Sequence, residues 1–189
     1  AASLQAISLS IAPIIASHSN IRAITNVSRN LSDLEIDKIA DAGGVINVAA
    51  FGAYLVDLSD PITLAAIIQV RVQHGLPEAY SYPYELYWEL SDAKAKRAFL
   101  TEMRSVIGSG SIVDMLVHID YIVDRVGIDH VGVGNDFNHG SGVQGFADAA
   151  DSKNLTAVLI ENGYSTADIQ KIWGANFLRV MKKAEQLAK

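Results

Sequence analysis

Four polar residues could take part in chemistry because of where they follow short apolar runs. His18 comes directly after one run, and Asp136 ends another. Arg29 lies in the loop that leaves the first run, and Tyr54 follows a third. In parallel α/β folds the carboxyl ends of the strands carry the active site. An imidazole and a carboxylate at such an edge, joined by a guanidinium and a phenol, would suit metal-assisted hydrolysis.

Each of these residues also has a simpler interpretation. A lone histidine after a strand is often structural, Asp136 could cap a glycine-rich loop, and Tyr54 could serve packing alone. Arg29 could be a solvated charge, although a cation beside a predicted helix N-terminus is electrostatically unfavourable, which favours an anionic ligand there. The sequence contains no His-x-His pair, no His-Glu-x-x-His motif and no cysteine. Spacing alone therefore leaves the alternatives open.

Three short, nearly continuous apolar runs, at residues 14–17, 45–51 and 130–136, predict the strands that must position these side chains. Continuous rather than alternating apolar residues are typical of parallel strands covered on both faces. Helical patterns separate the runs, among them a capping box at residues 32–35 and an amphipathic stretch at 112–126. Strands alternating with helices indicate a parallel α/β fold. Three strands with two open edges make an incomplete sheet, so we expect further chain to complete a barrel.

Length and composition are those of one globular domain. The 189 residues are 50% hydrophobic, which supports a large core. The net charge of −6 argues against a nucleic acid or an anionic membrane as partner, because both need a basic face. The longest nearly apolar stretch, residues 43–56, is shorter than the about 20 residues of a transmembrane helix. The absence of cysteine excludes disulfides and thiolate metal sites.

The chain opens inside a helical pattern and without methionine. We therefore expect it to be the remainder of a longer protein, in which case the lack of a visible targeting signal says little about the compartment.

Several stretches together resemble the membrane (renal) dipeptidase family of the amidohydrolase superfamily. They are residues 13–20, 28–31 and 127–137, and residues 176–180 are similar to the family's closing helix. The motifs follow one another in the family's order and at matching separations, and the resemblance covers nearly the whole chain. It implies an α/β fold that is the C-terminal half, about strands six to eight, of a (β/α)₈ barrel of TIM type. Residues 1–189 would form part of one domain, with an inserted helical and aromatic segment at about 55–110 that is similar to the bacterial branch.

The resemblance also implies a zinc-dependent dipeptidase with two metal ions, in which a metal-bridged hydroxide attacks the peptide carbonyl. His18 matches a metal ligand, Arg29 the residue that holds the substrate carboxylate, and Tyr54 a substrate-contacting tyrosine. Asp136 matches the catalytic aspartate, which binds the substrate amine and takes part in proton transfer. The other ligands belong to the first five strands, so we expect this chain to need the N-terminal half of the same protein. Asn138 stands where the family often has a second aspartate, which leaves the substrate preference open.

Two other functions stay open at this point. One is a different amidohydrolase reaction on the same barrel, because a fold does not determine a substrate. The other is a non-catalytic dipeptidase-like binding protein. The aromatic segment at 80–88 could form a lid or a homodimer contact, and packing over the barrel is the interpretation we favour. The resemblance slightly favours a periplasmic or secreted protein over a cytoplasmic one, and we expect His118, on the polar side of its helix, to be structural.

Overall fold

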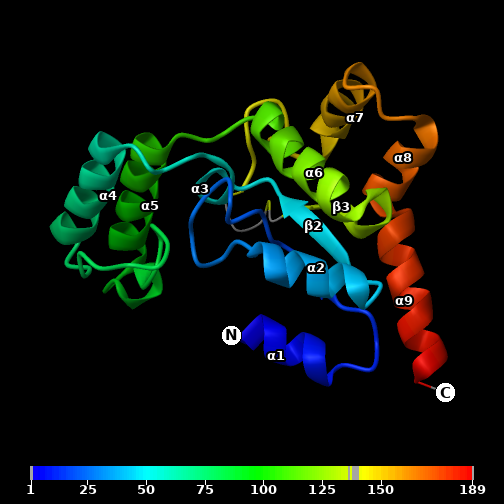
Figure 1. The fold of residues 1–189 in the computed structure, drawn as a ribbon. Helices are drawn as coiled ribbons and strands as arrows, with labels where there is room; N and C mark the ends of the chain where they lie inside the picture. Colours follow the sequence, from blue (N-terminus) through cyan, green and yellow to red (C-terminus); the bar gives the residue numbers. More distant parts are fainter. Residues whose placement is uncertain (1, 136, 138–140, 189) are drawn as a thin grey trace.

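The computed structural model describes residues 2–135, 137 and 141–188, so Asp136 and Asn138 lie outside the described residues (Figure 1). The described elements follow one another along the chain in this order: α1 (Ala2–Leu9), β1 (Ile15–Ala16), α2 (Asp33–Asp41), β2 (Val45–Ala49), α3 (Gly52–Leu55), α4 (Pro61–Gln73), η1 (Tyr87–Glu89), α5 (Ala93–Ile107), α6 (Ile112–Val126), η2 (Ile128–His130), β3 (Val131–Gly134), η4 (Ala149–Asp151), α7 (Ser152–Glu161), α8 (Thr166–Gln170), η5 (Lys171–Ala175) and α9 (Asn176–Leu187).

The strands of the described ranges form one parallel sheet in the order β1-β2-β3. Ile15 is paired with Val45, and Asn47 with Gly132. Each strand coincides with one of the three apolar runs, and helices separate the strands along the chain. The predicted parallel α/β arrangement is therefore confirmed.

Alternation along β2 and β3 separates the two faces of the sheet. Ile46 is fully buried against the helices, and its neighbour Asn47 points to the opposite face because successive side chains alternate. On that face β3 carries only glycine: a Cβ atom on Gly132 would collide with the side chain of Asn47, and one on Gly134 with the carbonyl of Ser17. Gly134 lets the end of β1 approach the end of β3 closely, and Gly132 leaves room for the side chain of Asn47.

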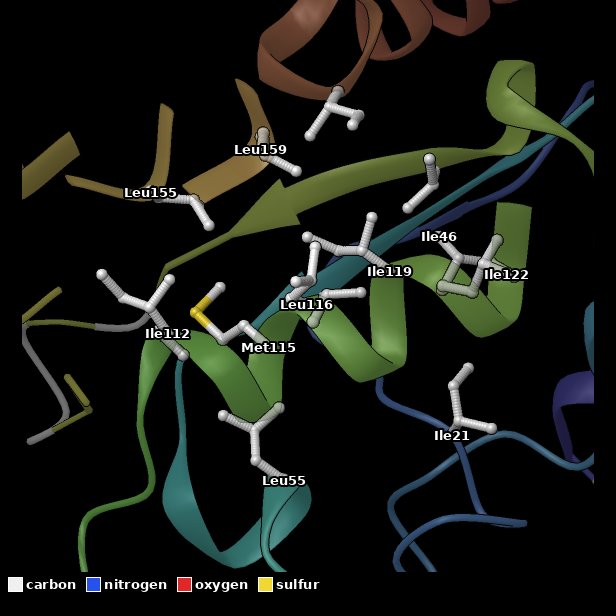
Figure 2. Packing of buried hydrophobic residues seen from close by; sticks show 14 of the residues in the cluster. Ile21, Ile46, Leu55, Ile112, Met115, Leu116, Ile119, Ile122, Leu155 and Leu159 are labelled. Atoms are coloured by element: carbon white, nitrogen blue, oxygen red, sulfur yellow. The ribbon is translucent and has the colours of Figure 1, made fainter. Parts of the chain in front are cut away.

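The larger hydrophobic core, which we call the strand core, lies between the sheet and helices α2, α6 and α7. Figure 2 shows Met115, Ile119 and Ile122 pointing from α6 toward the strands. All three are fully buried, and burying a side chain of this size contributes roughly 1.5–3 kcal/mol. The amphipathic pattern at 112–126 therefore positions β2 and β3 against α6.

The 55–110 segment builds a second, smaller core of its own, the segment core. Its helices α4 and α5 lie side by side at one end of the molecule (Figure 1). Ile67 of α4 packs there with Phe99 and Met103 of α5, and all three are fully buried. The description of this segment as an insertion in a single domain stays a prediction.

Helix α9 packs against the amino ends of β2 and β3. A π-helical turn, η5, joins α8 to α9, and Gly174 departs from helical geometry there (φ 164°, ψ −17°). In α9, Asn176 donates from Nδ2 to the carbonyls of Ile128 (2.7 Å) and Val131 (2.9 Å), which ties α9 to the start of β3. No helix in the described part of the chain is both long and apolar enough to cross a bilayer.

Candidate active site

A cavity of about 1150 Å³ lies where the carboxyl ends of β1 and β2 meet the 55–110 segment. His18, Arg29 and Tyr54 all line it. The structure thus brings together three of the four residues that the sequence singles out, and Asp136 lies outside the described residues. The cavity has two kinds of wall, one made by the loops after the strands and the other by the segment.

His18 joins the end of β1 to the end of β3. Its Nε2 lies 2.9 Å from the carbonyl oxygen of Asn135, and its Nδ1 lies 2.9 Å from the hydroxyl of Ser17. A carbonyl can only accept, so Nε2 carries the proton in this contact. The ring is half-buried.

Asn20 holds the loop that carries His18. The side chain of Asn20 is fully buried and pairs with the backbone of Ala49, accepting its N–H (2.8 Å) and donating to its carbonyl (3.1 Å). The backbone N–H of Ser19 donates to Asn47 (3.1 Å). Hydrogen bonds to β2 therefore continue beyond the end of β1 into this loop. Sequence reasoning missed Asn20, because a polar residue in a polar loop gives no sign of its burial.

His118 ties the loop after β1 to α3. Its Nδ1 accepts the backbone N–H of Ile21 (3.0 Å), so its Nε2 donates to the carbonyl of Leu55 (3.2 Å). The expectation of a polar-side position is wrong: the side chain is fully buried. Burial lowers the pKa of His118 to about 4, so the ring is neutral in the folded protein. His118 thereby supports the two elements that carry Arg29 and Tyr54.

Arg29 and Tyr54 form a pair at the cavity surface. The exposed guanidinium of Arg29 donates from Nε to the Tyr54 hydroxyl (3.2 Å). Asn30, next in the chain, donates from its buried Nδ2 to the carbonyls of Tyr54 and Thr25, both at 2.9 Å. The backbone around both residues is thus fixed while the cation faces the cavity.

Four aromatic side chains, which we call the aromatic wall, continue the cavity from Tyr54 into the segment: Phe51, Tyr54, Tyr82 and Tyr84. The ring centroid of Phe51 lies 4.7 Å from that of Tyr54 and 5.4 Å from that of Tyr84. The ring centroids of Tyr54 and Tyr82 are 6.4 Å apart. Burial raises the pKa of Tyr84 to about 12, so this phenol is uncharged at neutral pH.

Arg71 of α4 holds the loop that presents these tyrosines. Its guanidinium is fully buried and donates to the carbonyls of Pro77, Pro83 and Glu85, each at 2.9 Å. It also lies over the ring of Tyr80, 5.1 Å from the centroid. Sequence reasoning missed this role, although a single arginine in an otherwise apolar helix is a signal that could have revealed it.

Comparison with known proteins identifies the family. The model of the membrane dipeptidase family, peptidase family M19, matches residues 1–189. The chain belongs to this family. The match extends over both walls of the cavity.

Several other proteins are similar to this chain in sequence or in fold. The crystal structure of the probable dipeptidase PvdM from Pseudomonas aeruginosa is 38% identical and superposes with a TM-score of 0.79 over 98% of this chain and 48% of its own. Dipeptidase ataJ of Aspergillus terreus is 32% identical over 97% of this chain and 33% of its own length. A metallo peptidase from Rhodobacter sphaeroides, liganded with a phosphinate mimic of the dipeptide L-Ala-D-Ala, shares the fold with a TM-score of 0.66 and 22% identity.

The chain spans a third to about half of the length of these relatives, 33% of ataJ and 48% of PvdM. Its three parallel strands are therefore part of an M19 barrel, which confirms the expected fold class.

The donor atoms present fit one metal ligand rather than a complete metal centre. In the described ranges no group of three or more His, Asp or Glu side chains could hold a metal ion. A catalytic zinc uses about three protein ligands and a structural one about four. His18, which follows β1 and lines the cavity, has the chemistry of a single ligand. The expectation that the other ligands belong to strands outside this sequence stays a prediction.

Proposed function

We propose that the protein to which this chain belongs is a zinc-dependent dipeptidase, with its site at the cavity between the strands and the 55–110 segment. Membership of the M19 family supports a dipeptidase. The relatives named as dipeptidases and the metallo peptidase solved with a dipeptide mimic support metal-dependent hydrolysis of a dipeptide. The pair of Arg29 and Tyr54 beside His18 carries the proposal, because it places a carboxylate-binding group and a metal-binding group in one cavity.

His18 would be one ligand of a centre with two zinc ions, and the N-terminal half of the protein would contribute the rest. When bound, zinc supplies Lewis-acid activation of the scissile carbonyl and of water. To bind a metal, a ring nitrogen of His18 must exchange its present partner, Asn135 or Ser17, for the ion.

Arg29 would bind the C-terminal carboxylate of the dipeptide. A guanidinium can bind a carboxylate through two parallel hydrogen bonds. Tyr54 accepts from Nε and so orients the guanidinium, and the aromatic wall limits the access of water to the bound residue. This arrangement requires a free carboxylate at a set distance from the scissile bond, which is the property that distinguishes a dipeptide from a longer peptide.

Asp136 would bind the substrate amine and pass a proton to the leaving group. It follows Asn135, whose carbonyl contacts the His18 ring. Replacing Asp136 with asparagine should keep the bound zinc and lower kcat by roughly 10²–10⁴-fold. A fully active Asp136→Asn enzyme would instead give this residue the role of a loop cap.

The test of this function uses the full-length protein loaded with zinc. It should hydrolyse unblocked dipeptides, lose the activity on chelation and regain it on addition of zinc. A zinc-loaded protein that binds a phosphinate dipeptide mimic but hydrolyses no dipeptide would be the non-catalytic binding protein.

A further inference from the structure

The segment side of the cavity carries a basic stripe. Helix α5 is amphipathic: Phe99 and Met103 are buried in the segment core, and the opposite face lines the cavity. Residues three, four and seven positions apart share one face of a helix, and the cavity-lining residues of α5 follow that spacing: Arg97, Leu100, Thr101, Arg104 and Ser105.

The charges that line the cavity are opposite in sign to the chain as a whole. Among the described lining residues are four arginines, 22, 29, 97 and 104, and one glutamate, Glu35. The carboxylate of Glu35 accepts from the N–H and hydroxyl of Ser32 and lies 3.6 Å from Nη2 of Arg22. The chain has a net charge of −6, so this concentration of cations is local. A cavity lined by one sign of charge attracts ligands of the other sign.

Arg29 and Arg104 lie at two ends of the aromatic wall. Arg29 contacts the hydroxyl of Tyr54 (3.2 Å). At the other end, the guanidinium of Arg104 is close enough to Tyr84 to lower its pKa, against the larger rise that burial causes. Phe51 joins the two tyrosines, with ring centroids at 4.7 and 5.4 Å. A ligand lying along the wall would meet a cation at each end.

The acidic residue within this part of α5 points elsewhere. The carboxylate of Glu102 accepts from Nε2 of His74 at 3.0 Å, on the side of α4, and does not line the cavity. The stripe of α5 therefore presents cations to the cavity with no carboxylate of its own among the lining residues that the structure describes.

We propose that Arg104 and Arg97 form a subsite for an anionic side chain, so that the preferred substrates are dipeptides ending in aspartate or glutamate. The inference rests on the proposed function, in which Arg29 takes the C-terminal carboxylate. The second carboxylate of the same residue then extends along the aromatic wall to α5. Guanidinium groups suit this task because they bind carboxylates in a fixed planar geometry.

The experiment compares kcat/KM for Ala-Glu and Ala-Gln in the zinc-loaded, full-length enzyme. These substrates differ by one charge at nearly equal size. We expect a preference of about tenfold for Ala-Glu, carried by KM, as a charge-assisted hydrogen bond provides. Rising ionic strength should reduce the preference, because the guanidiniums are exposed. In Arg104→Gln, and further in the double variant with Arg97→Gln, the preference should fall toward one, because kcat/KM falls more for Ala-Glu than for Ala-Gln. Arg104→Lys should keep part of it.

Lys94→Gln is the matched control, since it removes a cation from α5 that does not line the cavity. It should leave the preference unchanged. Equal kcat/KM for Ala-Glu and Ala-Gln in the unmodified enzyme, or an equal loss for both in the Arg104 and Arg97 variants, overturns the subsite.

Failure of the proposed function is recognised separately. If the enzyme hydrolyses neither dipeptide, calorimetry with phosphinate analogues of Ala-Glu and Ala-Gln measures binding alone. If the acidic analogue binds more tightly and Arg104→Gln removes this difference, the subsite is upheld although the protein does not hydrolyse dipeptides. Equal affinities for the two analogues reject the subsite as well as the hydrolysis.

Discussion

The two walls of the cavity hold their functional groups by different means. On the strand side, buried polar side chains bond directly to the backbone: Asn20 to Ala49, and His118 to Ile21 and Leu55. On the segment side, the cavity groups sit on a separate hydrophobic core, with a loop fixed by one buried arginine. The difference suggests a division of work, in which the strand side holds the groups nearest the reaction and the segment side recognises the rest of the substrate.

The same difference predicts unequal local stability. The strand core includes fully buried residues from the sheet, α2, α6 and α7, whereas the segment core is built almost entirely from the 55–110 segment. Regions with a core of their own often open as separate cooperative units. The 55–110 segment should therefore be able to open locally while the sheet stays folded.

The largest expected effect separates the histidines of the two sides. Replacing His18 with alanine in the full-length enzyme should lower its zinc content and reduce dipeptide hydrolysis by more than about 100-fold, because losing a ligand exceeds the 10–100-fold typical of its supporting groups. His74→Ala is the matched control, since His74 lies in the segment, pairs with Glu102 and does not line the cavity. Elemental analysis and activity are measured together. Unchanged zinc in His18→Ala would make His18 structural.

Truncating a buried side chain should destabilise different parts of the fold in the two cores. Phe99 and Ile119 are both fully buried, and truncating such residues to alanine costs about 2–5 kcal/mol. Ile119→Ala should lower the stability of the sheet, and amide exchange should rise in β2. Phe99→Ala should raise exchange across residues 61–107 while leaving β2 protected. If amide exchange in β2 rises equally in both variants, the two cores unfold as one cooperative unit.

A smaller effect is the pH dependence that His118 confers on the strand side. Its pKa is about 4 in the folded protein, against 6.5 for an unperturbed histidine, so the unfolded chain binds more protons between these values. Stability contributed by neutral His118 is therefore complete above about pH 6.5 and declines as the pH falls toward 4, by about 3 kcal/mol in all. Urea unfolding from pH 7 to 4 measures this.

His118→Gln is the comparison, because an uncharged amide can still accept from Ile21 and donate to Leu55. The difference in unfolding free energy between the two proteins should change over this range, since other titrating groups are common to both. Identical pH profiles would contradict a neutral, buried His118.

The sequence predicts the helices and strands of this fold better than the long-range contacts that hold them together. The strands, the capping box of Ser32 and Glu35 and the amphipathic α6 are visible because they depend on local periodicity and local hydrogen bonds. Asn20, Arg71 and the burial of His118 are not visible, because their partners lie in distant parts of the chain. For the site, residues at strand ends indicate His18, Arg29 and Tyr54, whereas the cations of α5 come into view only when the segment is seen to line the cavity.

Binding of the dipeptide carboxylate by Arg29 is tested by comparing a free dipeptide with its C-terminal amide. The zinc-loaded, full-length enzyme should prefer the free dipeptide by about 100-fold in kcat/KM, within the range of charge-assisted contacts. Arg29→Met should raise KM for the free dipeptide and bring the preference close to one, while Tyr54→Phe, which keeps the ring, should reduce it less. If Arg29→Met retains the full preference, or lowers kcat/KM equally for the free dipeptide and its amide, Arg29 does not bind the carboxylate.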